Sequence, residues 1–159
     1  MARDIDHYDA VIDAPFGRIG VLLRDEAIVD IGFLSKSSPL ISPKTAAARR
    51  ACVQLQAYLK NPRTRFDLKL SVDGTAFQQR VWSALRRIPS GKVTSYGALA
   101  RRLETSARAV GNACRANPIP IVVPCHRVVS ATGDGGFMGK RAGQALLLKR
   151  WLLAHERDG

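Results

Sequence analysis

A cysteine, a histidine and an arginine follow one another at residues 125–127, directly after the apolar residues 121–123. A cysteine acts as a nucleophile in its thiolate form, which needs a base or a positive charge nearby. His126 is a candidate base and Arg127 adds positive potential, but adjacent side chains often diverge, so His126 would act through a water or a specific backbone turn. An inert buried thiol is the alternative. On these residues alone, Cys125 is a candidate nucleophile and no more.

The other two cysteines, Cys52 and Cys114, are predicted to be small buried side chains. Three cysteines cannot build a disulfide framework, so we expect a reducing compartment. The chain has no Cys-x2-Cys pair and its histidines are scattered, whereas a structural zinc ion needs four converging nitrogen or sulfur ligands. We therefore expect no metal ion, and no motif indicates another cofactor.

Two short helices are predicted on the N-terminal side of this cysteine, over residues 95–103 and 106–115. Such a pair is typical of a helix-turn-helix, although any helical hairpin resembles one. Arginines in both helices favour nucleic-acid binding. The second helix has mostly small side chains around Arg108, which favours close approach to a minor groove over base reading. An ordinary packing helix is the alternative.

The N-terminal part of the chain is predicted to form a small sheet with one helix. Strands are expected over residues 8–14, 19–23 and 27–34, with a further strand at 66–70. A helix capped by Thr45 is expected to run to residue 59. The side chains predicted to share its buried face are Ala48, Cys52, Leu55 and Leu59.

The composition is that of a globular protein, and the length suits one ordinary domain or two small ones. A linker near residues 71–74 separates the strand-rich part from a helical part, so we expect an α+β protein with domains at residues 1–71 and 72–159. The second domain is expected to open with an amphipathic helix over residues 75–87. Its inward-facing side chains are expected to be Phe77, Val81, Leu85 and Ile88. No apolar run approaches the roughly 20 residues of a membrane helix, and the acidic N-terminal residues argue against a secretory signal peptide. We expect a cytoplasmic protein that does not bind a membrane.

The charge of the chain is strongly positive and unevenly distributed. It has 25 Lys and Arg against 13 Asp and Glu, a formal net charge of +12. Residues 1–79 hold 11 basic and 9 acidic side chains, whereas residues 80–159 hold 14 basic and 4 acidic ones. A high pI can serve solubility alone, but the concentration of charge in the second half favours a polyanionic partner.

The segment Pro124-Cys125-His126-Arg127-Val128 resembles the active-site motif of the O6-alkylguanine-DNA alkyltransferases. The resemblance extends over residues 72–156, and each shorter match lies in the expected order and spacing. The matching segments are residues 74–82, 88–91, 95–97, 108–111, 117–118 and 151–156. The family fold that it implies has a small, ribonuclease H-like N-terminal domain of sheet and helix. A mostly helical, winged helix-turn-helix domain follows, which binds DNA and holds the active site.

The resemblance also implies a reaction, which is DNA repair by direct and irreversible alkyl transfer. The alkyl group would move from O6 of guanine, and from O4 of thymine, to Cys125 in a single turnover after nucleotide flipping. His126 would take the thiol proton through a water and Glu156 would orient His126. Asn117 would brace the active-site turn, and Tyr96 would donate a hydrogen bond to the base. No residue could cleave the thioether product.

The partner implied is double-stranded DNA that contains O6-alkylguanine, bound by a monomer, with cooperative binding left open. Arg108 would fill the space that the flipped nucleotide leaves. The residues expected to bind DNA are Thr94, Ser95, Tyr96, Ala107, Arg108, Ala109, Gly111, Arg115 and Arg127. The residues expected to line the alkyl pocket are Pro120, Val128, Met138 and Gly139, and the carbonyls of Cys125 and Val128 should face the amino group of the base.

Each implied role has an alternative in an ordinary fold. Tyr96 could be a core aromatic residue, Asn117 a turn residue before proline, and Glu156 a solvated charge near a helix end. For the whole protein, the alternatives are a non-catalytic lesion binder, a helix-turn-helix regulator and a thiol hydrolase. The loop at residues 132–143 is longer than in many members of the family, which leaves open how large an alkyl group fits.

Overall fold

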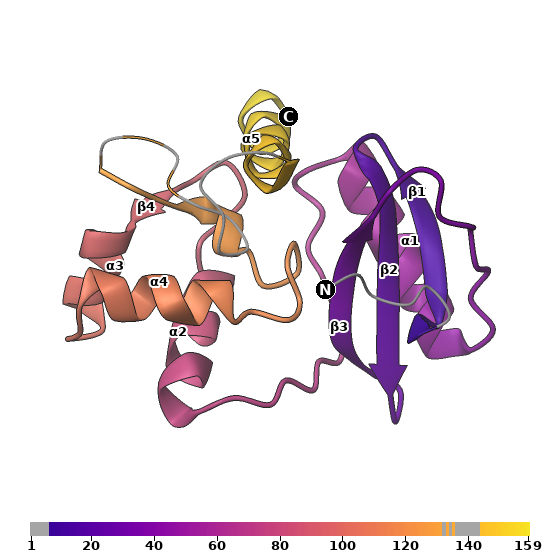
Figure 1. Ribbon diagram of the computed structural model, residues 1–159, viewed down its shortest axis with the longest axis horizontal. Coiled ribbons are helices and arrows are strands. Elements are labelled where there is room, and N and C mark those ends of the chain that lie inside the picture. Colours follow the sequence, from indigo (N-terminus) through magenta and orange to yellow (C-terminus); the bar gives the residue numbers. More distant parts are fainter. Residues whose placement is uncertain (1–6, 132, 134, 136–143) are drawn as a thin grey trace. The chain divides into compact units, whose positions relative to one another are not determined.

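The computed structural model describes residues 7–131, 133, 135 and 144–159 (Figure 1). The chain divides into two compact units, Met1–Val72 and Asp73–Gly159. The first unit is a small sheet with one long helix, and the second is mostly helical. The predicted α+β class is therefore confirmed. Within the described residues, no helix is long and apolar enough to cross a bilayer.

The sheet of the first unit is an antiparallel meander of β1 (Ala10–Ala14), β2 (Gly17–Arg24) and β3 (Ala27–Leu34), in that order. Asp25 and Glu26 join β2 to β3, and both have positive φ values, 52° and 68°. Positive φ at both central residues is the mark of the type I′ turn, whose twist suits a two-residue hairpin loop. The three N-terminal strands that the sequence predicts are therefore present.

One helix, α1 (Ala46–Lys60), packs against β1 and β2. Thr45 caps it as predicted, since its hydroxyl accepts a hydrogen bond from the Ala48 amide at 3.1 Å. The predicted buried face was wrong at its last position, because Tyr58 is buried and Leu59 is only half-buried. Spacings of three and four residues drift around a helix, and Tyr58 continues the buried stripe better than Leu59 does.

The strand predicted at residues 66–70 is absent, and only Leu70 forms an isolated bridge, to Ile28 of β3. The backbone of Asp67 pairs instead with a side chain of α1: the Asp67 amide donates to Gln54 Oε1 at 2.8 Å, and Gln54 Nε2 donates to the Asp67 carbonyl at 3.1 Å. A backbone already bonded to a side chain does not extend a ladder. The segment therefore lies against the helix.

The second unit opens with α2 (Ala76–Arg86), which Thr75 and Gln78 cap reciprocally in a capping box. Val81 and Leu85 are buried as predicted, whereas Phe77 is only half-buried. Trp82 supplies the larger anchor, because its ring nitrogen donates to the Ala113 carbonyl at 2.9 Å. That bond ties α2 to the helix that contains Ala113.

The two short helices predicted next are α3 (Tyr96–Arg102) and α4 (Ala107–Arg115), which pack against each other (Figure 1). Ser95 and Ser106 cap them, each accepting a hydrogen bond from the amide three residues later. Caps of this kind depend only on the local sequence, which is why the helix starts could be predicted.

The chain then runs through an irregular buried segment to the 3-10 helix η2 (Cys125–Arg127) and the strand β5 (Val128–Val129). β5 pairs in parallel with β4 (Thr94–Ser95), the two residues that lead into α3. This short ladder fixes the residues that follow η2 beside the start of α3. The last helix, α5 (Gln144–Asp158), contacts η2.

Candidate active site

Cys125 is the first residue of η2 and is only 6% exposed. Burial raises the pKa of its thiol, while a hydrogen bond with the Asn117 side chain and the positive charge of Lys149 lower it. The thiol is therefore the resting form. A reactive cysteine requires neighbours that favour the thiolate, and here they are the Asn117 amide and the Lys149 ammonium group.

Asn117 holds the segment in front of Cys125 with both ends of its side-chain amide. Its Oδ1 accepts from the Ile119 amide at 3.0 Å, and its Nδ2 donates to the Val123 carbonyl at 2.8 Å. The Cys125 amide donates to the same Val123 carbonyl at 2.8 Å. These bonds link Asn117 to the backbone of the turn that ends at the cysteine.

His126 is completely buried, and its Nε2 lies 2.9 Å from Oε2 of Glu156 on α5. A carboxylate only accepts, so Nε2 carries the proton of the neutral ring. Burial lowers the pKa of His126, and the Glu156 carboxylate partly opposes that effect. The other ring nitrogen, Nδ1, is buried and has no hydrogen-bond partner among the described residues. A neutral imidazole with a free Nδ1 can accept a proton there.

The expectation that Arg127 binds DNA is corrected by its contacts. Its guanidinium is buried and forms a two-point ion pair with Glu156, Nε to Oε1 at 2.9 Å and Nη2 to Oε2 at 2.8 Å. The remaining nitrogen, Nη1, donates to the Ile88 carbonyl at 2.5 Å. All three nitrogens bond inside the protein and the side chain is only 8% exposed, so the guanidinium is not presented to a phosphate on the surface. Its charge instead compensates that of Glu156.

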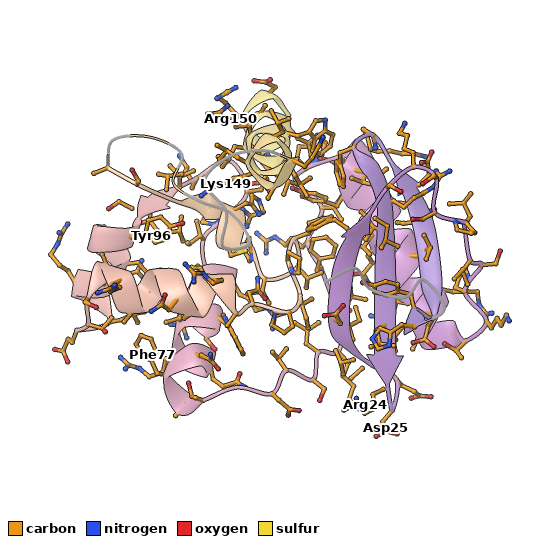
Figure 2. The ribbon with its side chains drawn as sticks, in the orientation of Figure 1. Arg24, Asp25, Phe77, Tyr96, Lys149 and Arg150 are labelled. Atoms are coloured by element: carbon orange, nitrogen blue, oxygen red, sulfur yellow. The ribbon has the colours of Figure 1, made fainter. Side chains whose placement is uncertain are left out.

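Lys149 is a site residue that the sequence analysis missed. It is completely buried on α5, and its Nζ donates to the Val128 carbonyl at 2.7 Å. The same Nζ lies 5.7 Å from the centre of the Tyr96 ring, and Figure 2 shows the two side chains in the same region of the unit. The spacing contained a signal, since Lys149, Leu152 and Glu156 lie on one buried stripe of α5.

The residues expected around the alkyl group are only partly described. Val128 and Pro120 are buried, and the Val128 carbonyl, expected to face the base, already accepts from Lys149. A carbonyl has a second lone pair, so this bond leaves room for another donor. Met138 and Gly139 lie outside the described residues. Gly135 borders Tyr96 closely, because a Cβ atom added to it would lie 2.9 Å from the Tyr96 ring.

The residues expected to bind DNA lie on α4 and at the start of α3. Ala107, Arg108 and Arg115 are exposed on α4, and Ala109 and Gly111 are half-buried. A Cβ atom added to Gly111 would meet nothing within 4 Å, so no neighbour inside the protein requires a glycine there. Thr94 and Ser95 are half-buried in β4, and Tyr96 is half-buried as the first residue of α3.

Cys52 and Cys114 are buried, as predicted. Burial raises the pKa of Cys52 to about 11 and that of Cys114 to about 12, where the nearby Cys125 adds to the effect and Lys149 opposes it. Neither is a good nucleophile near neutral pH. Within the part of the chain that the structure describes, no three His, Cys, Asp or Glu side chains gather where they could hold a metal ion.

The second unit, which contains Cys125, also shows which protein family the chain resembles. Residues 76–158 match the family model described as the DNA binding domain of 6-O-methylguanine DNA methyltransferase. This chain belongs to the 6-O-methylguanine DNA methyltransferase family. The match contains Tyr96, Asn117, Cys125 and Glu156, so the whole buried network lies inside the family domain.

Curated members of the family match most of the chain. A methylated-DNA–protein-cysteine methyltransferase of Mycobacterium bovis is 40% identical over 147 residues, which cover 86% of this chain and 88% of the relative. A protein with the same name from Methanosarcina acetivorans is 37% identical over 133 residues, which cover 79% and 85% of the two chains.

Solved structures of the family have the same fold. The crystal structure of the Mycobacterium tuberculosis O6-methylguanine methyltransferase has a TM-score of 0.77 and 37% identity, covering 93% of this chain and 91% of that one. A structure of the Mycobacterium tuberculosis OGT in complex with DNA has a TM-score of 0.78 and 38% identity, with the same coverage. The family relation therefore extends over both units.

Proposed function

We propose that this protein repairs DNA by moving an alkyl group from O6 of guanine to Sγ of Cys125. The observation that carries the proposal is the buried network in which Cys125 is followed by His126, whose Nε2 is bonded to Glu156. Nucleophile, base and orienting carboxylate form the arrangement that activates a weak nucleophile. The family membership and the DNA complex of a relative support DNA as the substrate.

The first step is removal of the thiol proton. Nδ1 of His126 has no protein partner among the described residues, which supports a water between it and Cys125. The proton passes from Sγ through this water to Nδ1, and Glu156 stabilises the positive charge that forms on the ring. The positive charge of Lys149 stabilises the thiolate.

The second step is the transfer itself. The Cys125 thiolate attacks the alkyl carbon, so that a carbon–sulfur bond forms while the carbon–O6 bond breaks. The bonding electrons stay with the guanine. His126 then gives up the proton that it took from the thiol, and this proton neutralises the guanine. Tyr96 donates a hydrogen bond to the base as it leaves. A thioether is stable, and no group among the described residues is placed to cleave it, so we expect each molecule to react once.

The DNA is proposed to lie against α4, with the damaged nucleotide flipped into the site and Arg108 in the vacated space. The exposed Arg108 and Arg115 and the small side chains between them support close approach to the minor groove. Phosphate contacts would make the affinity depend steeply on salt. We extend the proposal to O4-alkylthymine as a second substrate and to a protein that binds as a monomer.

Three finer assignments belong to the same proposal. The three-stranded meander with α1 supports a ribonuclease H-like N-terminal domain over residues 1–71. The α3–α4 pair supports a winged helix-turn-helix domain over residues 72–159. Repair of chromosomal DNA would take place in the cytoplasm, at the nucleoid if the source is bacterial.

The test is an intact-mass measurement after incubation with a duplex that contains one O6-methylguanine. The proposal predicts one added methyl group per protein molecule, no second addition with excess DNA, and no addition in Cys125→Ser. An unmodified protein that still binds the lesion tightly would identify a non-catalytic lesion binder. Demethylation of more than one equivalent of DNA would identify a turnover enzyme.

A further inference from the structure

Ile121 has a backbone conformation that its side chain disfavours. Among the described residues, four that are not glycine have positive φ values, and three of them are exposed acidic residues: Asp25, Glu26 and Glu104. Ile121 has a φ of 75° and is only 1% exposed. A β-branched residue in the left-handed region is a genuine outlier, which persists only where the surroundings hold it in place.

The surroundings of Ile121 do hold it. The Val123 amide donates to the Ile119 carbonyl at 2.9 Å and closes a turn with Ile121 at its centre. Asn117 bonds to the backbone of both closing residues, to the Ile119 amide and to the Val123 carbonyl. Burial of the isoleucine side chain adds a third restraint. The conformation is therefore fixed from both ends and from its centre.

This turn is connected directly to the nucleophile. The Val123 carbonyl accepts from Asn117 and also from the Cys125 amide at 2.8 Å. A change in the turn that moves this carbonyl moves the backbone of Cys125 with it. Glycine would adopt the same φ without steric cost, but it would leave the turn free to adopt other conformations. A stiff, buried and branched side chain removes that freedom.

We propose that Ile121 is a positioning residue for alkyl transfer, whose buried side chain holds the left-handed turn that sets the position of Cys125 relative to His126. The inference rests on the proposed function, since it assigns Ile121 a role in the reaction of Cys125. It predicts that changes at Ile121 alter the rate of transfer more than they alter DNA binding.

The test compares Ile121→Val, Ile121→Ala and Ile121→Gly in the full chain. Three quantities are measured: thermal stability, affinity for an unmodified duplex, and the first-order rate constant of methyl transfer at saturating O6-methylguanine duplex. Leu99→Ala is the matched control, because Leu99 is a completely buried residue of α3 in the same unit. The control should lose stability and keep the rate constant of the wild type within the error of the measurement.

We expect the alanine and glycine variants to transfer at least tenfold more slowly, with duplex affinity within twofold of the wild type. The glycine variant should be at least as stable as the alanine variant, the reverse of the order at ordinary positions. Valine keeps the branch and should slow transfer only two- to threefold, and it decides the question if the smaller variants do not fold.

Two results would overturn the positioning role alone. The first is a wild-type rate constant in Ile121→Gly, or in Ile121→Val if only that variant folds. The second is an alanine variant that is more stable than the glycine variant. If the wild type itself transfers no methyl group to Cys125, the proposed function fails first and the role of Ile121 fails with it. These outcomes are distinguished because the wild type is measured in the same assay.

Discussion

Glu156→Gln removes one negative charge and leaves the shape of the side chain almost unchanged. In the wild type, the carboxylate accepts two hydrogen bonds from Arg127, at 2.9 and 2.8 Å, and one from His126 at 2.9 Å. All three side chains are buried. In the variant, the guanidinium loses its counter-charge and the amide nitrogen of Gln faces one of its former donors.

The magnitude follows from this geometry. Removal of one partner of a buried ion pair costs about 3–5 kcal/mol, because the remaining charge stays buried without compensation. For a chain of this size each kcal/mol lowers Tm by about 2–4 °C, so we expect a decrease of roughly 6–20 °C. Loss of the carboxylate also weakens His126 as a base, since the negative charge supports its protonated form. The transfer rate constant should fall at least about tenfold.

The assay is thermal unfolding together with single-turnover transfer from an O6-methylguanine duplex. Asp158→Asn is the matched control, because Asp158 is a carboxylate on the same helix whose ion pair with Arg157 is exposed. Exposed pairs contribute about 0–1 kcal/mol, so the control should unfold and react almost as the wild type does. If Glu156→Gln unfolds within 2 °C of the wild type, as the control should, the carboxylate is not the buried counter-charge and the reasoning is wrong.

Three further predictions concern stability, DNA binding and pH. Gly111→Ala should raise the free energy of unfolding by about 1 kcal/mol in denaturant titrations, yet weaken duplex binding roughly tenfold in fluorescence anisotropy if α4 approaches DNA closely; unchanged affinity would contradict that contact. Trp82→Phe should cost about 1–3 kcal/mol in the same titrations, because the Ala113 carbonyl loses its bond. Burial raises the pKa of Cys114 from 9.0 to about 12. The protonated thiol therefore contributes fully to the free energy of unfolding below about pH 9, and this contribution decreases as the pH rises above 9. The wild type should lose about 1.4 kcal/mol more than Cys114→Ala by pH 10, and equal losses would refute this.

The local parts of the fold could be predicted from the sequence. Thr45, Thr75, Ser95 and Ser106 each cap a helix through a bond to an amide three residues away. Such bonds depend on the residues around the cap, so the helix starts follow from a single sequence. The strand expected at 66–70 failed for the opposite reason, because its backbone bonds to Gln54, which is 13 residues away.

The buried network of the site could be predicted only in part. The family resemblance pointed to Cys125, His126 and Glu156, but the pairing of Arg127 with Glu156 joins residues 29 positions apart. In a chain with many exposed arginines, nothing in the residues next to Arg127 indicates that its side chain is buried. Lys149 was missed for the same reason, although its place on the buried stripe of α5 was visible in the spacing.

The left-handed conformation of Ile121 had no sequence signal at all. Residue preferences for positive φ favour glycine, asparagine and aspartate, so a propensity argument assigns isoleucine to extended backbone. The conformation results from the Asn117 bonds and from burial. Strain of this kind is visible only once the chain has folded.

The central claim is that Cys125, and neither of the other cysteines, receives the alkyl group. Peptide-level mass spectrometry of the protein after reaction with an O6-methylguanine duplex tests it most directly. We predict a methyl group on the peptide that contains Cys125. Cys52 and Cys114 should stay unmodified, because burial raises the pKa of both thiols and no hydrogen bond lowers it, as the Asn117 side chain does for Cys125. A methyl group on Cys114 or Cys52 in place of Cys125 would contradict it.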